Sequence, residues 1–216
     1  MDDELVRRAG LHAALGEPVR LAVVDELAMS DRSPKELADR FELPTNLIAH
    51  HLDVLDAVGL IERFASAGDR RRRYVRLVRG PLAELGIMSL QCRPRRVVFV
   101  CSQNSARSQL AAALWTARTG GQASSAGTHP ADRVHPGAVA AGRRAGLDLE
   151  GAVPRIVDLH ALDDLVVTVC DRAHEEIDAQ PSWWHWSIPD PVEAGTNAAF
   201  DATIADLDER ITIVTN

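Results

Sequence analysis

The hydrophobic pattern divides the chain into two parts with different periodicities. In the first part apolar residues recur every three or four positions, which predicts helices, and two short alternating segments then predict strands. Pro18 interrupts the first apolar row and predicts a break there. The expected order is helix over 10–29, helix over 33–41, helix over 45–58, strand over 61–66, strand over 72–77 and helix over 81–90.

The start of the second helix carries three agreeing signals. Ser33 can cap the helix, Pro34 suits its first turn, and Glu36 completes a capping box. Thr45 is expected to cap the next helix, which Gly59 closes.

The second part alternates short apolar runs with helical segments. The run at 96–100 is nearly continuous, which is typical of a strand buried on both faces of a parallel sheet. This alternation predicts the α/β class, with a doubly wound four-stranded parallel sheet. In the first part, the order of a capped helix, a short turn, a longer helix and an arginine-rich hairpin predicts a winged helix-turn-helix (α+β) domain. Strands are expected over 96–100, 123–126, 165–169 and 184–188, and helices over 105–119, 136–145 and 198–213.

Composition places the chain among ordinary globular proteins. It has 216 residues, of which 46% are hydrophobic and 25% charged, which suits one or two domains. No apolar run reaches the length of a transmembrane helix, and the N-terminus MDDELVRRAG lacks the apolar region of a signal peptide. Three cysteines are too few for a disulfide scaffold, so we expect a cytoplasmic protein with no membrane partner.

Charge is unevenly distributed. The formal net charge is −7, but residues 1–93 carry only −1 of it and residues 94–216 carry −6. Residues 60–80 hold seven arginines against two acidic residues, a local excess of +5. The overall acidity therefore does not exclude nucleic acid as a partner.

The strongest chemical signal is a cysteine and an arginine with five residues between them, located between an apolar strand and a helix. Such a loop points backbone N–H groups into one concavity, and Arg107 can grip a tetrahedral oxyanion through two N–H bonds. The positive electrostatic field of these N–H groups and of Arg107 should favour a nucleophilic thiolate at Cys101. Ser108 is expected to donate a hydrogen bond to this thiolate, and Asn104 to brace the loop. The expected oxyanion-binding residues are Ser102, Gln103, Asn104, Ser105, Ala106, Arg107 and Ser108.

Residues 95–216 resemble the low-molecular-weight protein tyrosine phosphatase family and its arsenate reductase branch. The resemblance rests on CSQNSARS at 101–108, SSAGT at 124–128, VVTVC at 166–170 and HWSIPDP at 185–191. It implies an arsenate or phosphate oxyanion as substrate, with Asp190 as the acid that protonates the leaving oxygen.

The two branches differ in thiols and aromatic residues. Cys170 matches the second cysteine of thioredoxin-linked arsenate reductases, but Ile177 stands where those enzymes carry a third. Three outcomes stay open. A disulfide between Cys101 and Cys170 is reduced directly by a redoxin, a low-molecular-weight thiol attacks the arsenic adduct on Cys101, or arsenate is not reduced at all. We expect an external thiol reductant, no tightly bound cofactor and no metal.

The residues after Asp190 favour the reductase branch. Val192 and Glu193 follow Asp190-Pro191, where the phosphatase branch usually has tyrosines, and Gln109 is similar to the reductase branch. Arsenate reductase is the preferred interpretation. A tyrosine phosphatase and a non-catalytic oxyanion- or arsenical-sensing repressor are the alternatives.

Residues 10–80 resemble the arsenic-repressor type of winged helix-turn-helix regulators. The resemblance rests on LGEPVRLAVVDEL at 15–27, SPKELADRFELP at 33–44 and IAHHLDVLDAVGLIER at 48–63. It implies a homodimer on a palindromic double-stranded DNA operator. The helix at 35–40 lacks the cysteine pair that binds metal in many such repressors. Expected DNA-contacting residues are Thr45, Asn46, Ala49 and His50 on the recognition helix and Arg70, Arg71, Arg72 and Arg73 on the wing.

The sequence therefore predicts a fusion acting in arsenic resistance. A DNA-binding domain is expected over residues 1–92 and an arsenate reductase-like domain over 95–216. The operator, the electron donor, the coupling of the two domains and the role of Cys92 stay open.

Overall fold

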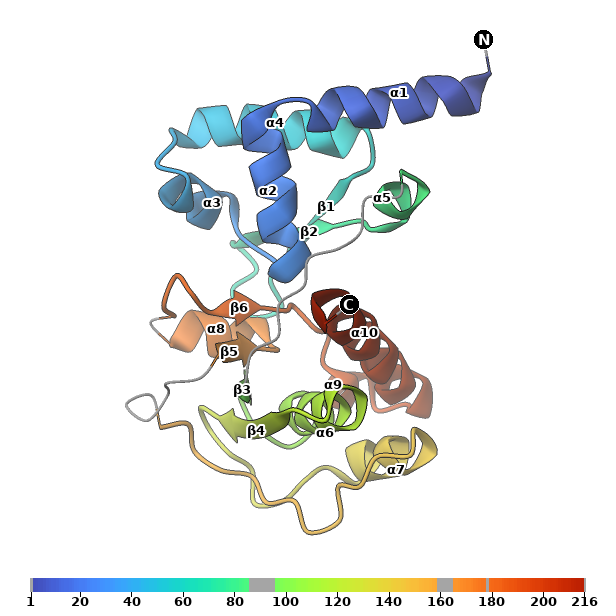
Figure 1. Cartoon of the computed structure of the whole chain (residues 1–216). Helices are drawn as coiled ribbons and strands as arrows, with labels where there is room; N and C mark the ends of the chain where they lie inside the picture. The colour runs from blue at the N-terminus through green and yellow to red at the C-terminus, as the bar shows by residue number, and fades with distance from the viewer. Residues whose placement is uncertain (1, 86–95, 159–164, 178, 216) are drawn as a thin grey trace. The chain divides into compact units, whose positions relative to one another are not determined.

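The computed structural model describes residues 2–85, 96–158, 165–177 and 179–215 (Figure 1). The chain divides into two compact units, one made of Met1–Ser66 with Arg70–Leu90 and the other of Ala67–Asp69 with Gln91–Asn216. The linker expected at 91–96 lies, apart from Arg96, outside the described residues, as do Cys92 and the second half of the helix expected over 81–90. No helix in the described ranges combines the length and the apolar character needed to cross a membrane.

The first unit has the predicted order of helices and strands. A break separates its first two helices, and Pro18 begins the second, as the sequence predicts. The strands β1 and β2 pair antiparallel, with Ile61 opposite Leu77. The elements are α1 (Asp3–Leu15), α2 (Pro18–Met29), α3 (Pro34–Arg40), α4 (Thr45–Ala57), β1 (Ile61–Ala65), β2 (Arg73–Leu77) and α5 (Gly80–Glu84).

The start of α3 follows its local sequence signals, whereas the start of α4 does not. The capping box is confirmed, because Ser33 Oγ accepts from Glu36 N at 3.3 Å and Glu36 returns a bond to Ser33 N at 2.6 Å. The expected cap at Thr45 is wrong. Pro44 is the N-cap and provides no side-chain bond, so Thr45 is the first helical residue, which frees its side chain for the surface.

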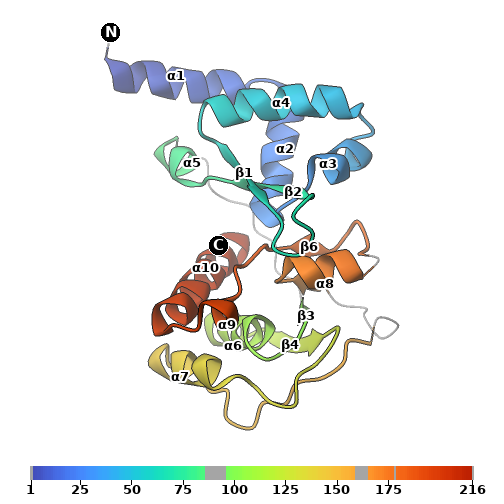
Figure 2. The ribbon, with the colours of Figure 1, turned by 180° about the vertical axis from the view of Figure 1, so that it is seen from behind.

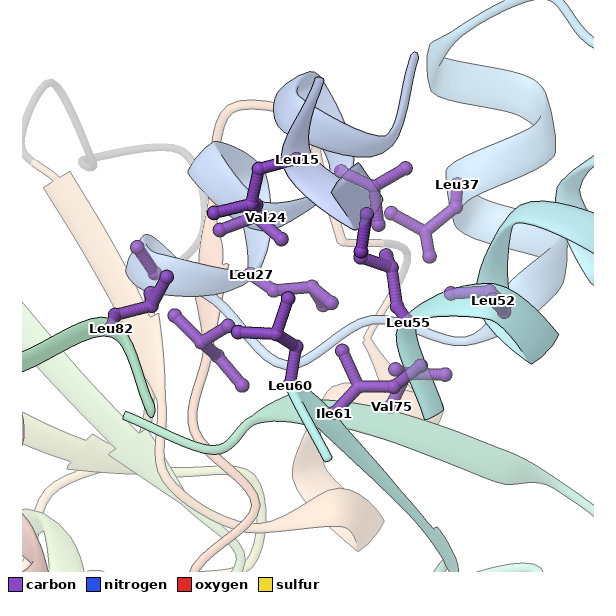
Figure 3. Packing of buried hydrophobic residues seen from close by; sticks show 14 of the residues in the cluster. Leu15, Val24, Leu27, Leu37, Leu52, Leu55, Leu60, Ile61, Val75 and Leu82 are labelled. Carbon is purple, nitrogen blue, oxygen red and sulfur yellow. The ribbon is translucent and has the colours of Figure 1, made fainter. Parts of the chain in front are cut away.

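The core of the first unit forms where the helices meet the hairpin. Leu27, Leu37, Leu55 and Leu60 are fully buried or nearly so, and Figure 3 shows such side chains pointing into one interior. Each buried leucine contributes on the order of 1.5–3 kcal/mol relative to an exposed one. This packing holds α4 against the unit with its polar face outward.

The second unit is built on a four-stranded parallel sheet, as predicted, and its strand order is β4-β3-β5-β6. In Figures 1 and 2 the helices α6, α7, α9 and α10 form one group and α8 lies apart from it. The elements are β3 (Arg96–Cys101), α6 (Arg107–Thr119), β4 (Gln122–Gly127), α7 (Pro136–Arg144), β5 (Leu165–Thr168), α8 (Asp171–Glu176), β6 (Trp184–His185), α9 (Pro191–Ala194) and α10 (Asn197–Thr215).

The strand order is typical of sheets that bind a ligand at the carboxyl ends of their strands. After β3 the chain forms β4 on one side of it and later forms β5 on its other side, so the strand order reverses at β3. In such sheets ligands bind outside the carboxyl ends of the strands, at the point where the order reverses. Val100 of β3 is in register with Thr168 of β5, so Cys101 and Cys170 leave neighbouring strands at the same end. The last strand is shorter than expected and ends at His185.

Candidate active site and DNA-binding surface

The residues expected to bind an oxyanion form one loop from the end of β3 to the first turn of α6, which we call the anion loop (residues 101–108). Cys101 is buried at the base of this loop, and Asn104 adopts a left-handed backbone with φ of 47°. Asparagine tolerates that conformation better than other non-glycine residues. The helix expected from Ser105 starts at Arg107, because the preceding residues are used in the loop.

The loop is held from outside by the segment that follows β4. Backbone N–H groups of residues 128–135 donate to the carbonyl oxygens of Cys101, Ser102, Gln103 and Ser105 at 2.8–3.2 Å. With the carbonyl groups bound on this side, the N–H groups face the other side, as a cradle for an anion requires.

Gly127, the last residue of β4, lies directly against the backbone of the anion loop. A Cβ atom there would lie 2.6 Å from the carbonyl oxygen of Ser102 and 2.9 Å from Asn104 N, so only glycine fits. The SSAGT segment, which ends at Thr128, predicts only a family resemblance, and this role of its glycine was not predicted from the sequence. The glycine within the motif was the available signal.

Asn104 connects the loop to Cys101. Its N–H donates to Cys101 Sγ at 3.2 Å, and its Nδ2 donates to Ser108 Oγ at 2.8 Å. Ser108 Oγ lies 3.0 Å from Cys101 Sγ, within hydrogen-bonding distance, and either group can be the donor. Gln109 braces Asn104 through bonds of 3.0 and 3.2 Å, and Arg155 N donates to Asn104 Oδ1 at 2.8 Å.

The electrostatics of Cys101 correct one expectation. Burial, followed by the neighbouring Cys170, raises the pKa of the Cys101 thiol above its ordinary value, against the opposing effects of Arg107 and Ser108. The prediction that the positive electrostatic field of the loop lowers the pKa of Cys101 is therefore wrong, because the effect of burial is larger.

Arg107 and Asp190 form a short ion pair at the rim of the loop. The Arg107 guanidinium donates to Asp190 Oδ2 at 2.6 Å and to the carbonyl oxygen of Ile188 at 3.1 Å. Asp190 also caps α9, since its Oδ1 accepts from Val192 N at 3.0 Å. The aspartate before proline is thus fixed beside the anion loop.

Cys170 follows β5 and is buried. Its sulfur lies 3.4 Å from Ser102 Oγ and accepts from Ala173 N at 3.4 Å. Cys101, Arg107, Cys170 and Asp190 line one pocket, so all four expected catalytic residues come together.

The aromatic residues near the site belong to the interior. Trp183, Trp184 and Trp186 are buried, while Val192 and Glu193 line the pocket. Among the pocket residues that the structure describes there is no aromatic side chain. Ile177, at the position of the missing third thiol, is buried at the end of α8.

The expected DNA-contacting residues lie on the surface of the first unit. Thr45, Asn46 and His50 are exposed on α4, and Ala49 is half-buried beside them. All four wing arginines, at 70–73, are exposed. In the described ranges no group of three or more His, Cys, Asp or Glu is arranged to hold a metal ion.

Comparisons with known proteins separate the same two parts. The model of the low molecular weight phosphotyrosine protein phosphatase family matches residues 96–215, and a helix-turn-helix domain model matches residues 15–63. An arsenate reductase from Bacillus licheniformis is 33% identical over 129 residues, covering 54% of this chain and 92% of the relative.

Two further similarities concern one part each. The HTH-type transcriptional repressor SmtB from Mycobacterium tuberculosis is 38% identical over 73 residues, which span 33% of this chain and half of the repressor. A solved arsenate reductase structure from Archaeoglobus fulgidus is 31% identical, with a TM-score of 0.46, covering 53% of this chain and 94% of that one.

Proposed function

Because the chain belongs to the low molecular weight phosphotyrosine protein phosphatase family over residues 96–215, we propose that this part reduces arsenate and acts with the helix-turn-helix domain as a DNA-binding regulator. One observation carries the reductase proposal. A second buried thiol, Cys170, lies at the same end of the sheet as Cys101 and is linked to the anion loop through Ser102. Two thiols can supply the two electrons that arsenate reduction needs.

The first step uses the anion loop. The loop N–H groups and Arg107 bind arsenate, Cys101 gives its thiol proton to a bound arsenate oxygen, and the resulting thiolate attacks arsenic. A sulfur–arsenic bond forms and an arsenic–oxygen bond breaks, and Asp190 in its protonated form, no longer paired with Arg107, gives its proton to the departing oxygen so that it leaves as water.

The second step transfers the electrons. The thiolate of Cys170 attacks Cys101 Sγ, forming a disulfide and breaking the sulfur–arsenic bond. The electron pair of that bond stays on arsenic, which leaves as arsenite, and the two cysteines are oxidised. An external thiol reductant, a redoxin or a low-molecular-weight thiol, then returns the cysteines to thiols. This requirement for reduced thiols supports a cytoplasmic location.

The test is production of arsenite by the purified chain with arsenate and either thioredoxin or a low-molecular-weight thiol. We expect Cys101→Ser to abolish the reaction, and Cys170→Ser to abolish the thioredoxin-dependent rate. Mass spectrometry after arsenate exposure should find a Cys101–Cys170 disulfide, and Cys92→Ser serves as the matched control. No arsenite above the Cys101→Ser background with any reductant would contradict the proposal.

A phosphatase is the second candidate, because Cys101, Arg107 and Asp190 suffice for phosphoryl transfer followed by attack of water. The lack of an aromatic residue among the described pocket residues argues against an aryl substrate. Rapid aryl-phosphate turnover that survives Cys170→Ser, without arsenite formation, would favour this candidate.

For the helix-turn-helix domain we propose that α4 reads base edges in the major groove of a palindromic operator. Thr45, Asn46, Ala49 and His50 would contact bases, and Arg70, Arg71, Arg72 and Arg73 would contact phosphates or a minor groove. The proposed domain limits are 1–92 and 95–216, with a homodimer as the binding form. Replacing Arg72 and Arg73 by alanine should weaken binding to all sequences and reduce the salt slope by about 2. An unchanged salt slope would contradict the wing assignment.

The alternative of an oxyanion- or arsenical-sensing repressor is tested in the same binding experiment. It predicts that operator affinity shifts with arsenate, phosphate or arsenite. Affinity that is indifferent to all three would exclude it.

A further inference from the structure

A buried polar cluster lies around the turn that carries Cys170, and the proposed chemistry does not use it. Its members are Thr168 at the end of β5, Asp171 and His174 in α8, and His185 in β6. Thr168 and His185 are fully buried, and Asp171 and His174 are at most 5% exposed. Polar groups at such depth are costly unless they are hydrogen-bonded, so their arrangement needs a reason. We call these four residues the histidine cluster.

The hydroxyl of Thr168 is the centre of the histidine cluster. Its Oγ1 lies 2.9 Å from His185 Nδ1, 3.1 Å from His174 Nδ1 and 3.3 Å from the carbonyl oxygen of Trp184. The two imidazole rings stack with centroids 4.1 Å apart and an angle of 14°. A threonine hydroxyl donates one hydrogen bond and accepts two, so at least one of the two imidazoles carries a proton on Nδ1.

The other nitrogen of His185 reaches Asp171. His185 Nε2 lies 3.1 Å from Asp171 Oδ1. Burial raises the pKa of Asp171, but the hydrogen bond and charge of His185 and the hydrogen bond of Ser187 bring it down to about 2. Asp171 is therefore ionised at neutral pH, and His185 Nε2 is the donor toward it.

These bonds enclose the turn from 168 to 171. Thr168 precedes Cys170 by two residues and Asp171 follows it, and both are tied to His185 on the neighbouring strand. On the other side of the turn, Cys170 Sγ faces Ser102 of the anion loop. The side chains next to Cys170 are thus fixed to β6 while its sulfur points to the site.

We propose that the histidine cluster is a positioning device that holds the β5–α8 turn so that Cys170 can attack Cys101. This inference rests on the proposed function, which gives Cys170 its task. Thr168 and His185 act through Cys170 and contact neither arsenate nor the Cys101 sulfur in this role.

The test compares two substitutions of the central hydroxyl in the full chain. Thr168→Val keeps the shape and removes Oγ1, whereas Thr168→Ser keeps the hydroxyl. Thr203→Val is the matched control, because Thr203 is also a buried threonine. The described hydrogen bond of its Oγ1 is a donation to the carbonyl oxygen of Ala199 in the same helix, at 3.0 Å. The rate measured is formation of the Cys101–Cys170 disulfide with diamide, which accepts the two electrons and two protons that the thiols lose. Phosphate affinity reports separately on the anion loop.

We expect Thr168→Val to slow disulfide formation about tenfold, which corresponds to ~1.4 kcal/mol in the barrier. Thr168→Ser and Thr203→Val should stay within about twofold of the parent chain, and phosphate affinity should be unchanged in all three. A rate for Thr168→Val equal to that of Thr203→Val would overturn the inference. So would a parallel loss of phosphate affinity, which would show a general disruption of the site.

Two further arms complete the experiment. If Thr168→Val does not fold, His185→Gln replaces it, because glutamine keeps a donor for Asp171 and loses the contact with Thr168. Diamide needs no arsenate, so a parent chain that forms the disulfide but makes no arsenite contradicts the proposed function alone. A parent chain in which diamide forms no Cys101–Cys170 disulfide overturns the positioning role.

Discussion

A single methyl group added at Gly127 tests whether the segment after β4 shapes the anion loop. In Gly127→Ala the new Cβ would meet the carbonyl oxygen of Ser102 at 2.6 Å, where ordinary contacts begin at 3.4 Å. The contact is with backbone, so the loop must move by about 0.8 Å, the difference between these distances. A displacement of ~1 Å in a catalytic group costs on the order of 100-fold in rate. We therefore expect phosphate affinity and arsenate reduction to fall by one to two orders of magnitude, alongside an overpacking cost of about 1–3 kcal/mol in stability.

Gly142→Ala provides the matched control. Its Cβ would meet the end of the Leu149 side chain at 2.7 Å, which can rotate away, and the site lies in α7 rather than against the loop. Phosphate titration by calorimetry and arsenite formation are measured for both variants, with urea unfolding to separate stability from binding. Parental affinity and turnover in Gly127→Ala would refute the argument that this glycine sets the loop geometry.

Three other outcomes follow from the site. Ser108→Ala removes a hydrogen bond that lowers the pKa of Cys101, so the pH midpoint of Cys101 alkylation should rise, and an unchanged midpoint would contradict the contact at 3.0 Å. Asp190→Asn removes the proposed general acid and should slow formation of the arsenic adduct on Cys101 by ~10²-fold or more without weakening phosphate binding, as single-turnover kinetics would reveal; full activity would exclude that role. The lowered pKa of Asp171 stabilises the fold above its unfolded pKa of about 4, and this stabilisation of ~2 kcal/mol is lost as pH falls toward 2. Unfolding free energies measured across that range should therefore decline less steeply in Asp171→Asn, and equal slopes would argue against the pair with His185.

Features set by neighbouring residues were predictable from the sequence. The capping box at Ser33, the break at Pro18 and the strand before Cys101 depend on residues within one or two turns of each other. The same holds for the loop from Cys101 to Ser108. Thr45 was assigned wrongly because Pro44 can occupy the N-cap without a side-chain bond.

Features that depend on distant packing were not predictable. Helices α8 and α9 have six and four residues, too few to establish a period, and β6 has only two. The pKa of Cys101 was predicted in the wrong direction because burial is a property of the assembled sheet. Gly127 and the histidine cluster likewise acquire their roles from segments that meet only in the fold.

The placement of the two thiols on neighbouring strands has a thermodynamic consequence. A bond between Cys101 and Cys170 would close a loop of about 70 residues, and restricting such a loop in the unfolded chain is worth on the order of 4 kcal/mol. Oxidation would then make the unit harder to unfold, and reduction would return it to a less constrained state. Resistance to heat or to proteolysis would thus record whether the catalytic cycle has stopped at the disulfide.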